Sequence, residues 1–320
     1  MRLDDYLNDV HTVGVSGHVR PDGDCIGSVL GVYNYIRKTH PDIQIIPYLE
    51  PVPFDFEFLP GVDKLKRANK FDGTKYDLFI ACDCGDLGRL GDSGVYFSNA
   101  LKTICIDHHE TNGAFADVNY VFPEASSTCE LIGQIIDNDK IDKDIASCLY
   151  TGIVTDTGCF QYNCTHRSTM EFAGVLMDKG IDYPFIVDHV FYEKSLKQLQ
   201  MLGVGITNAK VFCNGKVIGS YVTADEMKKY DAAPKNMEGV VSTLRSVNGV
   251  EVALFMYPTE KGDYKVSARA STDTVDLSKL ASEYGGGGHK RAAGFSLDGD
   301  DPAAMVEMLV EKIAPFFGEN

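Results

Sequence analysis

Residues 11–38 read HTVGVSGHVRPDGDCIGSVLGVYNYIRK, and this stretch decides the predicted fold. Its first six residues (11–16) include β-branched side chains and predict a strand. The segment 25–38 carries apolar side chains at helical spacing and predicts a helix. A loop rich in Gly, Asp and His separates the two. A strand, a loop and a helix in this order are typical of an α/β fold with a parallel sheet.

The same alternation of strand and helix patterns continues through the first half of the chain. Further strands are expected over 43–49, 76–82 and 101–106, and helices over 128–137, 143–155 and 168–179. We therefore expect an N-terminal parallel-sheet domain over residues 1–190.

The second half of the chain predicts a smaller domain with a mixed sheet. A polar segment over 191–208 is expected to be a helical linker, and residues 209–320 are expected to form the second, α/β domain. Strands are expected there over 210–212, 217–222, 250–257 and 264–270, and helices near 237–246, 277–284 and 303–316.

Composition and charge exclude several classes of protein. The 320 residues contain 46 acidic and 30 basic side chains, a formal net charge of -16, so attraction to long duplex nucleic acid or to an anionic membrane is not expected. The nine cysteines are an odd number set mostly in apolar runs, as in a reduced protein. The N-terminus lacks the apolar segment of a signal peptide, and no long apolar segment follows. We expect a soluble protein of the cytoplasm.

Acids and histidines follow each of three expected strands directly. They are His18, Asp22 and Asp24 after the first, Asp83 after the strand 76–82, and Asp107, His108 and His109 after the strand 101–106. A further acid, Asp156, follows the apolar run 150–154. Because the carboxyl ends of parallel strands share one edge of a sheet, where open α/β sheets bind ligands, these side chains should converge.

Several carboxylates this close together would repel one another, and bound cations relieve such repulsion. Two divalent cations would neutralise four carboxylates. A set of Asp and His donors without thiolate suits manganese, iron, cobalt or magnesium better than structural zinc. We therefore expect two metal ions that share one acid, with a bridging water as nucleophile, as in sites that hydrolyse phosphate esters.

Simpler interpretations exist for each single feature. Asp24 could cap the helix that begins there, and a His-His pair is usually a surface or core feature. The segment Ser126–Glu130 could be a helix N-cap or a turn that contacts a base or phosphate, and we favour the cap. Cys82 and Cys84 should point to the same face of a strand, as structural thiols. Four acidic groups at four element ends together favour the metal site.

Four segments resemble the motifs of the DHH phosphoesterase superfamily: HVRPDGDCIGS (18–28), DCGDLGRLG (83–91), DHHETN (107–112) and TGIVTDTGCF (151–160). The segment GGGGHKRAAGF (285–295) resembles the glycine-rich signature of the DHH-associated substrate domain. By length and domain make-up, the chain is most similar to the bacterial nano-RNase and pAp phosphatase group of this superfamily.

The resemblance implies a role for each residue of the predicted site. It assigns one manganese to His18, Asp22 and Asp83, and the other to Asp24, Asp83, His108 and Asp156. Asp83 would bridge the two ions, His109 would contact the scissile phosphate, and Asp107 would orient a neighbouring histidine. Cys25 stands where the superfamily usually has a small residue.

The glycine-rich segment predicts a phosphate-binding loop. Consecutive glycines allow the amide groups of Gly286, Gly287 and Gly288 to point at an anion, and His289 and Arg291 add side-chain donors. A glycine run alone is most often a flexible turn, but its basic flank and the resemblance favour binding. Arg269 resembles the second phosphate-binding arginine of the family.

These observations lead to an expected activity. We expect a manganese-dependent hydrolase that releases 5′-mononucleotides from short 5′-phosphorylated oligoribonucleotides and converts pAp to AMP. The alternatives are a phosphodiesterase for cyclic di-AMP or pApA, and a non-catalytic nucleotide-binding regulator. No membrane or long duplex partner is expected, and the sequence leaves a homodimer open.

Overall fold

The computed structural model describes residues 1–68 and 71–318, and the chain divides into two compact units, Met1–Glu193 and Lys194–Asn320. Each unit contains one sheet with helices packed against it. The predicted class is confirmed: the first sheet is parallel and the second is mixed. Within the described residues, no helix combines the length and apolar character that a membrane span needs.

The first sheet has the strand order β2-β1-β3-β4-β5, and all of its described neighbours are parallel. Its strands are β1 (Thr12–Ser16), β2 (Gln44–Tyr48), β3 (Leu78–Cys82), β4 (Lys102–Asp107) and β5 (Val118–Val121). The sequence pattern located the first four within a few residues. It missed β5, a short strand whose residues are only partly buried and which therefore lacks a strong apolar pattern.

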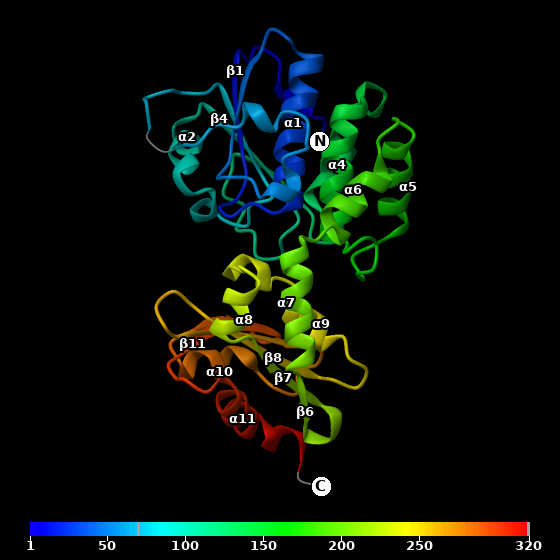
Figure 1. The fold of residues 1–320 in the computed structure, drawn as a ribbon. Coiled ribbons are helices and arrows are strands. Elements are labelled where there is room, and N and C mark those ends of the chain that lie inside the picture. Colours follow the sequence, from blue (N-terminus) through cyan, green and yellow to red (C-terminus); the bar gives the residue numbers. More distant parts are fainter. Residues whose placement is uncertain (69–70, 319–320) are drawn as a thin grey trace. The chain divides into compact units, whose positions relative to one another are not determined.

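The helices of the first unit cover both faces of this sheet. They are α1 (Gly23–Thr39), α2 (Gly94–Asn99), α3 (Thr128–Ile135), α4 (Lys143–Asp156), α5 (Arg167–Met177) and α6 (Tyr183–Val187). Figure 1 shows α1 and α4 next to each other on one side of the sheet, where their apolar side chains form the larger core, and α2 on the other side. The core on the α2 side is aromatic and includes Tyr76, Phe79 and Phe97. The sheet is therefore buried on both faces, as its continuous apolar strands require.

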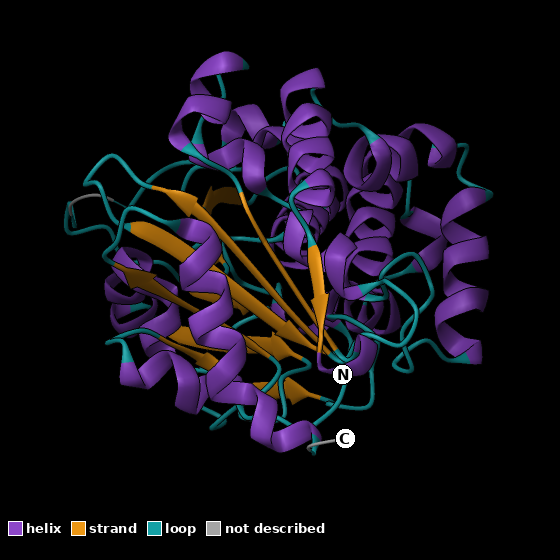
Figure 2. Ribbon diagram, turned by 60° about the horizontal axis from the view of Figure 1, so that its bottom comes forward, coloured by secondary structure: helices purple, strands orange, loops and turns teal. Residues whose placement is uncertain are grey.

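The second unit contains a sheet with the order β10-β11-β9-β8-β7-β6. Its strands are β6 (Lys210–Phe212), β7 (Val217–Tyr221), β8 (Val252–Pro258), β9 (Tyr264–Ala270), β10 (Gly287–His289) and β11 (Ala292–Leu297). Among these strands β7 and β8 are parallel, and the other described pairs are antiparallel. Figure 2 distinguishes the strands, in orange, from the purple helices that pack against them.

The helices of the second unit are α7 (Leu196–Thr207), α8 (Ala224–Lys229), α9 (Val240–Arg245), α10 (Leu277–Glu283) and α11 (Pro302–Ile313). The segment 191–208 is expected to be a helical linker. In the structure, Met201 of α7 is fully buried in a core that also contains Val240 and Phe255. The helix is therefore a packed part of the second unit, because one of its faces is apolar.

The glycine-rich segment differs most from the sequence-based expectation. A phosphate-binding loop is expected there, and in the structure Gly287–His289 form the edge strand β10, which pairs with β11. A Cβ atom on Gly288 would lie 2.4 Å from the carbonyl oxygen of Ala292, and its φ is +145°. The glycine is thus required by close strand pairing, a constraint that a sequence pattern does not reveal.

Candidate metal centre

Asp83 lies at the centre of the predicted cluster, directly after β3. Its Oδ2 atom is 3.4 Å from Nε2 of His18, and its Oδ1 atom is 3.6 Å from Nε2 of His108. The residue is buried and has a φ of +53°, which is uncommon outside glycine. Its N–H donates to the carbonyl oxygen of Ile106 at 2.9 Å, which fixes this strained backbone against β4. The two oxygens of one rigid carboxylate therefore face two different histidines.

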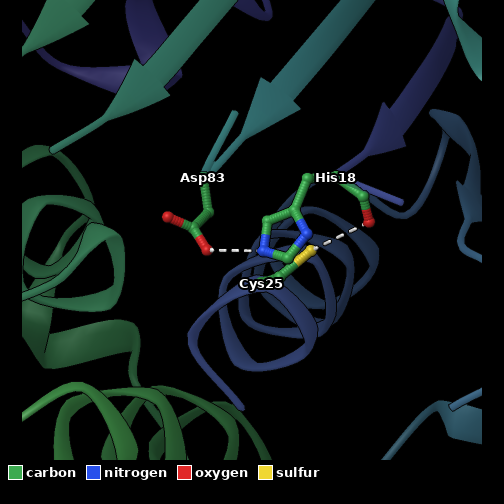
Figure 3. Close-up of side chains that lie close together, drawn as sticks. All are labelled: His18, Cys25 and Asp83. Atoms are coloured by element: carbon green, nitrogen blue, oxygen red, sulfur yellow. Dashed lines mark hydrogen bonds and ion pairs between the residues drawn. The ribbon is translucent and has the colours of Figure 1, made fainter. Parts of the chain in front are cut away.

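His18 forms the first half of the cluster with Asp22 and Asp83. Its Nε2 atom is also 3.6 Å from Oδ2 of Asp22. The Asp22 side chain additionally caps α1, because its Oδ1 accepts the N–H of Cys25 at 3.1 Å. Figure 3 shows the imidazole of His18 close to the Asp83 carboxylate and to the Cys25 thiol, which lies 3.8 Å from the carbonyl oxygen of His18.

His108 forms the second half of the cluster. Its Nε2 atom is 3.1 Å from Oδ2 of Asp156 and 3.9 Å from Oδ2 of Asp24. The Nδ1 atom is 3.4 Å from the carbonyl oxygen of Ala125, which can only accept. In a neutral ring that binds a cation, Nδ1 would therefore carry the proton, and the lone pair of Nε2 would be available to the cation.

His109 is held by a separate hydrogen bond beside the cluster. Its Nδ1 atom is 2.7 Å from Oδ1 of Asp107, and Oδ2 of Asp107 accepts the side-chain N–H of Asn112 at 2.7 Å. Asp107 is fully buried, whereas the His109 side chain is 41% exposed. Asp107 thus orients His109 so that the other ring nitrogen is free for a ligand. Asn112 is not among the site residues predicted from the sequence.

Asp24 does not cap α1, the simpler alternative considered for it. Its fully buried carboxylate instead lies at the start of α3, where Oδ2 accepts the N–H of Thr128 at 2.7 Å and Oδ1 accepts that of Cys129 at 3.0 Å. A helix N-terminus stabilises a carboxylate through its free N–H groups and its dipole. This contact fixes Asp24 next to His108.

The segment Ser126–Glu130 contains the predicted N-cap. Ser127 caps α3 by accepting the N–H of Glu130 at 3.1 Å, which confirms the favoured interpretation. The buried Glu130 carboxylate accepts the hydroxyl groups of Ser126 and Thr169. Thr128 was missed as a site residue, yet its hydroxyl donates to Oδ1 of Asp83 at 3.2 Å. The turn that caps α3 therefore also positions Asp24 and Asp83.

The crowding of charge shifts the pKa values of the cluster. Burial, with the charges of Asp83 and Asp156, raises the pKa of Asp24 well above its usual range. Burial also raises the pKa of Asp156. For His108, burial alone would lower the pKa, but Asp156, Asp24 and Asp83 together raise it to about 10. Protons thus compensate the carboxylates when no cation does so.

The donor set fits divalent cations. Ligand atoms lie within 4.8 Å of one another in three groups: His18 with Cys25 and Asp83; Asp83 with His108 and His109; and Asp24 with His108 and Asp156. Burial raises the pKa of the Cys25 thiol to about 12, so this group remains a neutral thiol at physiological pH. The available donors are then carboxylate oxygens and imidazole nitrogens, the set expected from the sequence.

The remaining predicted residues lie in the second unit. Arg269 in β9 pairs with Ala292 in β11, and Ala292 pairs with His289 in β10, so the three side chains share one face in one row. The small Ala292 leaves space between the two larger side chains. The Nε atom of Arg291 is 2.7 Å from Oδ1 of Asp273, so its guanidinium is already paired.

One prediction about the cysteines is wrong. Cys82 and Cys84 do not share a face: Cys82 lies in the core beneath α1, and Cys84 lies in the aromatic core on the opposite face of the sheet. The positive φ of Asp83 ends the alternation of the strand between them. Because both thiols are buried, their structural interpretation holds.

Comparison with known proteins places these groups in context. The family description "DHH family, N-terminal domain" matches residues 12–153, and "DHHA1 domain" matches residues 214–317. The chain is 29% identical to the bifunctional oligoribonuclease and PAP phosphatase NrnA of Bacillus subtilis, over 92% of each chain. It is 27% identical to the protein of the same name from Thermus thermophilus, over 93% of this chain and 88% of that one.

A solved structure shows the same fold. The exopolyphosphatase-related protein from Bacteroides fragilis superimposes with a TM-score of 0.84 at 27% identity. The match covers 99% of this chain and 96% of that one, so both units are represented.

Proposed function

Because the chain belongs to the DHH family and is a phosphoester hydrolase, we propose that it releases 5′-mononucleotides from short oligoribonucleotides and converts pAp to AMP. The observation that carries this proposal is the Asp83 carboxylate, whose two oxygens face His18 and His108 separately. The names of the two curated relatives support the choice of substrates.

We assign the cluster to two divalent cations, with manganese as the expected metal. His18, Asp22 and Asp83 would hold one ion, and Asp24, Asp83, His108 and Asp156 the other. When bound, such ions polarise the phosphate and make water acidic enough to act as a nucleophile near neutral pH. The protein keeps both histidines correctly oriented and their acids fixed.

His109 is proposed to contact the scissile phosphate directly. Its Nδ1 is held by Asp107, and its side chain is the most exposed of the histidines in the cluster. As water adds to phosphorus, the P–O3′ bond breaks and the 3′-oxygen leaves with a proton. A donor held rigidly at the phosphate stabilises the charge that develops in this step.

The second unit is proposed to bind a phosphate group of the substrate. Arg269 and His289 would supply donors from one face of the sheet. Because two of the three residues of the edge strand β10 (Gly287–His289) are glycines, little side-chain bulk would hinder the approach of a phosphate. Gly286 and Arg291 lie on either side of Gly287–His289 in the sequence. A phosphate gains affinity from several convergent donors of this kind.

The proposed function can be tested with purified protein and manganese. Separate reactions would contain pAp, pApA, a short oligoribonucleotide or cyclic di-AMP, and products would be resolved by chromatography. AMP from the first two and mononucleotides from the third, with cyclic di-AMP intact, support the proposal. Efficient opening of cyclic di-AMP would instead support second-messenger turnover. Binding without any product would support a nucleotide-binding regulator.

Metal binding should release protons. In the metal-free protein, the raised pKa values of His108 (about 10) and His18 keep both rings protonated at neutral pH. The pKa of His18 is raised because Asp22 and Asp83 outweigh the effect of burial. Since metals bind neutral imidazole, affinity should rise with pH. Calorimetric titration with manganese in two buffers of different ionisation enthalpy checks this; equal heats in both buffers would contradict it.

Removing the hydroxyl of Thr128 should weaken metal binding. Thr128→Val keeps the shape and the backbone N–H to Asp24 but loses the hydrogen bond to Oδ1 of Asp83. We expect manganese affinity to fall about 10- to 100-fold, the usual effect of losing a group that orients a ligand. Thr128→Ser, which retains the hydroxyl, should restore most of the affinity. Equal affinity of Thr128→Val and wild type would show that this hydroxyl has no positioning role.

A further inference from the structure

A cavity of about 190 Å³ lies within the first unit, at the carboxyl ends of β1 and β2. His18 forms part of its wall, and the Nε2 atom of the same residue faces the carboxylates of the cluster. Ligands of open α/β sheets bind outside the carboxyl ends of the strands. A ligand with its phosphate at the cluster can therefore place the neighbouring chemical group in this cavity.

The lining of the cavity combines apolar and polar groups. Tyr48, Leu90 and Pro51 contribute apolar surface, and Glu50, Arg67 and Asp92 contribute charge. A few polar groups set among apolar walls are typical of small-molecule sites. This combination matches a nucleoside, which has flat apolar faces and a polar edge.

The charge of the lining argues against a second phosphate. The lining contains two carboxylates, those of Glu50 and Asp92, and one guanidinium, that of Arg67. The adjoining groove shares Glu50 and Arg67 and adds Glu57 and Asp63. An anion would be repelled by this excess of acids, whereas a neutral base and ribose would not. The small volume also favours a single nucleoside over a longer segment.

One contact connects this cavity to the metal cluster, and one charged side chain of its lining is unpaired within the described residues. Oε2 of Glu50 accepts the N–H of Arg20 at 2.7 Å, which ties the cavity to the loop that carries Asp22. Arg20 has a φ of +56°, so this loop needs such support. Within residues 1–68 and 71–318, the Arg67 side chain has no hydrogen-bond or ion-pair partner. A guanidinium in this state can stack on a base and donate to its acceptors.

We propose that this cavity, with Arg67 in its lining, binds the nucleoside whose 5′-oxygen carries the scissile phosphate. The inference rests on the proposed function and extends it. In pApA this is the 3′-terminal nucleoside, which leaves as AMP. In pAp the scissile 3′-phosphate is terminal, so nothing occupies the cavity. The cavity would thus be occupied during hydrolysis of an oligonucleotide but not of pAp, although both reactions are proposed for the same metal centre.

The test compares Arg67→Ala with Lys66→Ala, using pApA and pAp as substrates. Lys66 is the matched control, because it is adjacent, exposed and equally charged but does not line the cavity. We expect Arg67→Ala to raise the ratio of KM for pApA to KM for pAp about tenfold, the effect of losing one base contact. Lys66→Ala should leave this ratio as in wild type.

A second substrate isolates the contact with the base. An analogue of pApA that lacks the 3′-terminal base should show the same KM with wild type and with Arg67→Ala. If wild type hydrolyses neither pAp nor pApA, the proposed function fails. If wild type hydrolyses both and Arg67→Ala leaves the KM ratio unchanged, the cavity is not the nucleoside site. If Arg67→Ala raises the KM for the analogue, relative to the KM for pAp, as much as it does for pApA, the proposed base contact is also excluded.

Discussion

Asp83→Ala is expected to abolish hydrolysis and to remove most of the metal affinity of the protein. Both oxygens of this carboxylate face histidines of the cluster, at 3.4 Å and 3.6 Å, so one substitution affects both halves of the site. We expect kcat/KM to fall by more than about a hundredfold, because even groups that only orient a ligand cost 10- to 100-fold. Steady-state kinetics with pAp and calorimetric titration with manganese measure the two effects.

Glu110→Ala is a suitable control for this variant. Glu110 is an exposed acid in the segment that follows His109, and its removal changes the net charge equally. Its activity and metal affinity should stay close to those of wild type. Activity of Asp83→Ala within tenfold of wild type would contradict the shared-ligand assignment. Circular dichroism should accompany both measurements, since Asp83 is buried beside β4.

His109→Ala is expected to lower kcat about 10²- to 10³-fold while manganese affinity changes little. The ring is 41% exposed and is held by Asp107, so it can contact a phosphate without being needed to hold a metal. Asp107 keeps its hydrogen bond from Asn112 after the substitution, which limits the structural effect. Kinetics with pAp give kcat and KM, and metal titration gives the affinity.

Two outcomes would contradict the role proposed for His109. If kcat stays within tenfold of wild type, the ring does not stabilise the reaction. If metal affinity falls in parallel with kcat, His109 is a metal ligand, which its 3.6 Å distance from Oδ1 of Asp83 makes a direct alternative. A fall in kcat with unchanged metal affinity would contradict both of these alternatives and support the contact with the phosphate.

The strands differ in how well they could be predicted from the sequence. β3 (Leu78–Cys82) and β4 (Lys102–Asp107) are buried, nearly continuous apolar runs, which only a central parallel strand needs. β5 (Val118–Val121) and β10 (Gly287–His289) are edge strands with little buried apolar surface, so their sequences lack this pattern. Their pairing is decided by a neighbouring strand, which sequence periodicity does not describe.

The candidate site shows the same division. Most of its acids and histidines could be predicted because they follow strand ends, and parallel strands bring those ends to one edge. The contacts that fix these side chains could not be predicted from the sequence. Asp24 is held by Thr128, 104 residues further along the chain, and Thr128 also contacts Asp83, 45 residues before it. No local pattern relates residues at such separations.

By itself, the sequence predicted the α/β class, most of the strands of the first sheet, and the acids and histidines that follow them. These follow from hydrophobic periodicity and from the chemistry of Asp and His, which are local properties of the chain. Only the tertiary structure decided which oxygen of Asp83 faces which histidine, that α3 binds Asp24, and that a cavity opens beside His18. These features arise from packing between segments that are far apart in the sequence. Backbone strain, contacts with helix ends and buried charge all contribute to them.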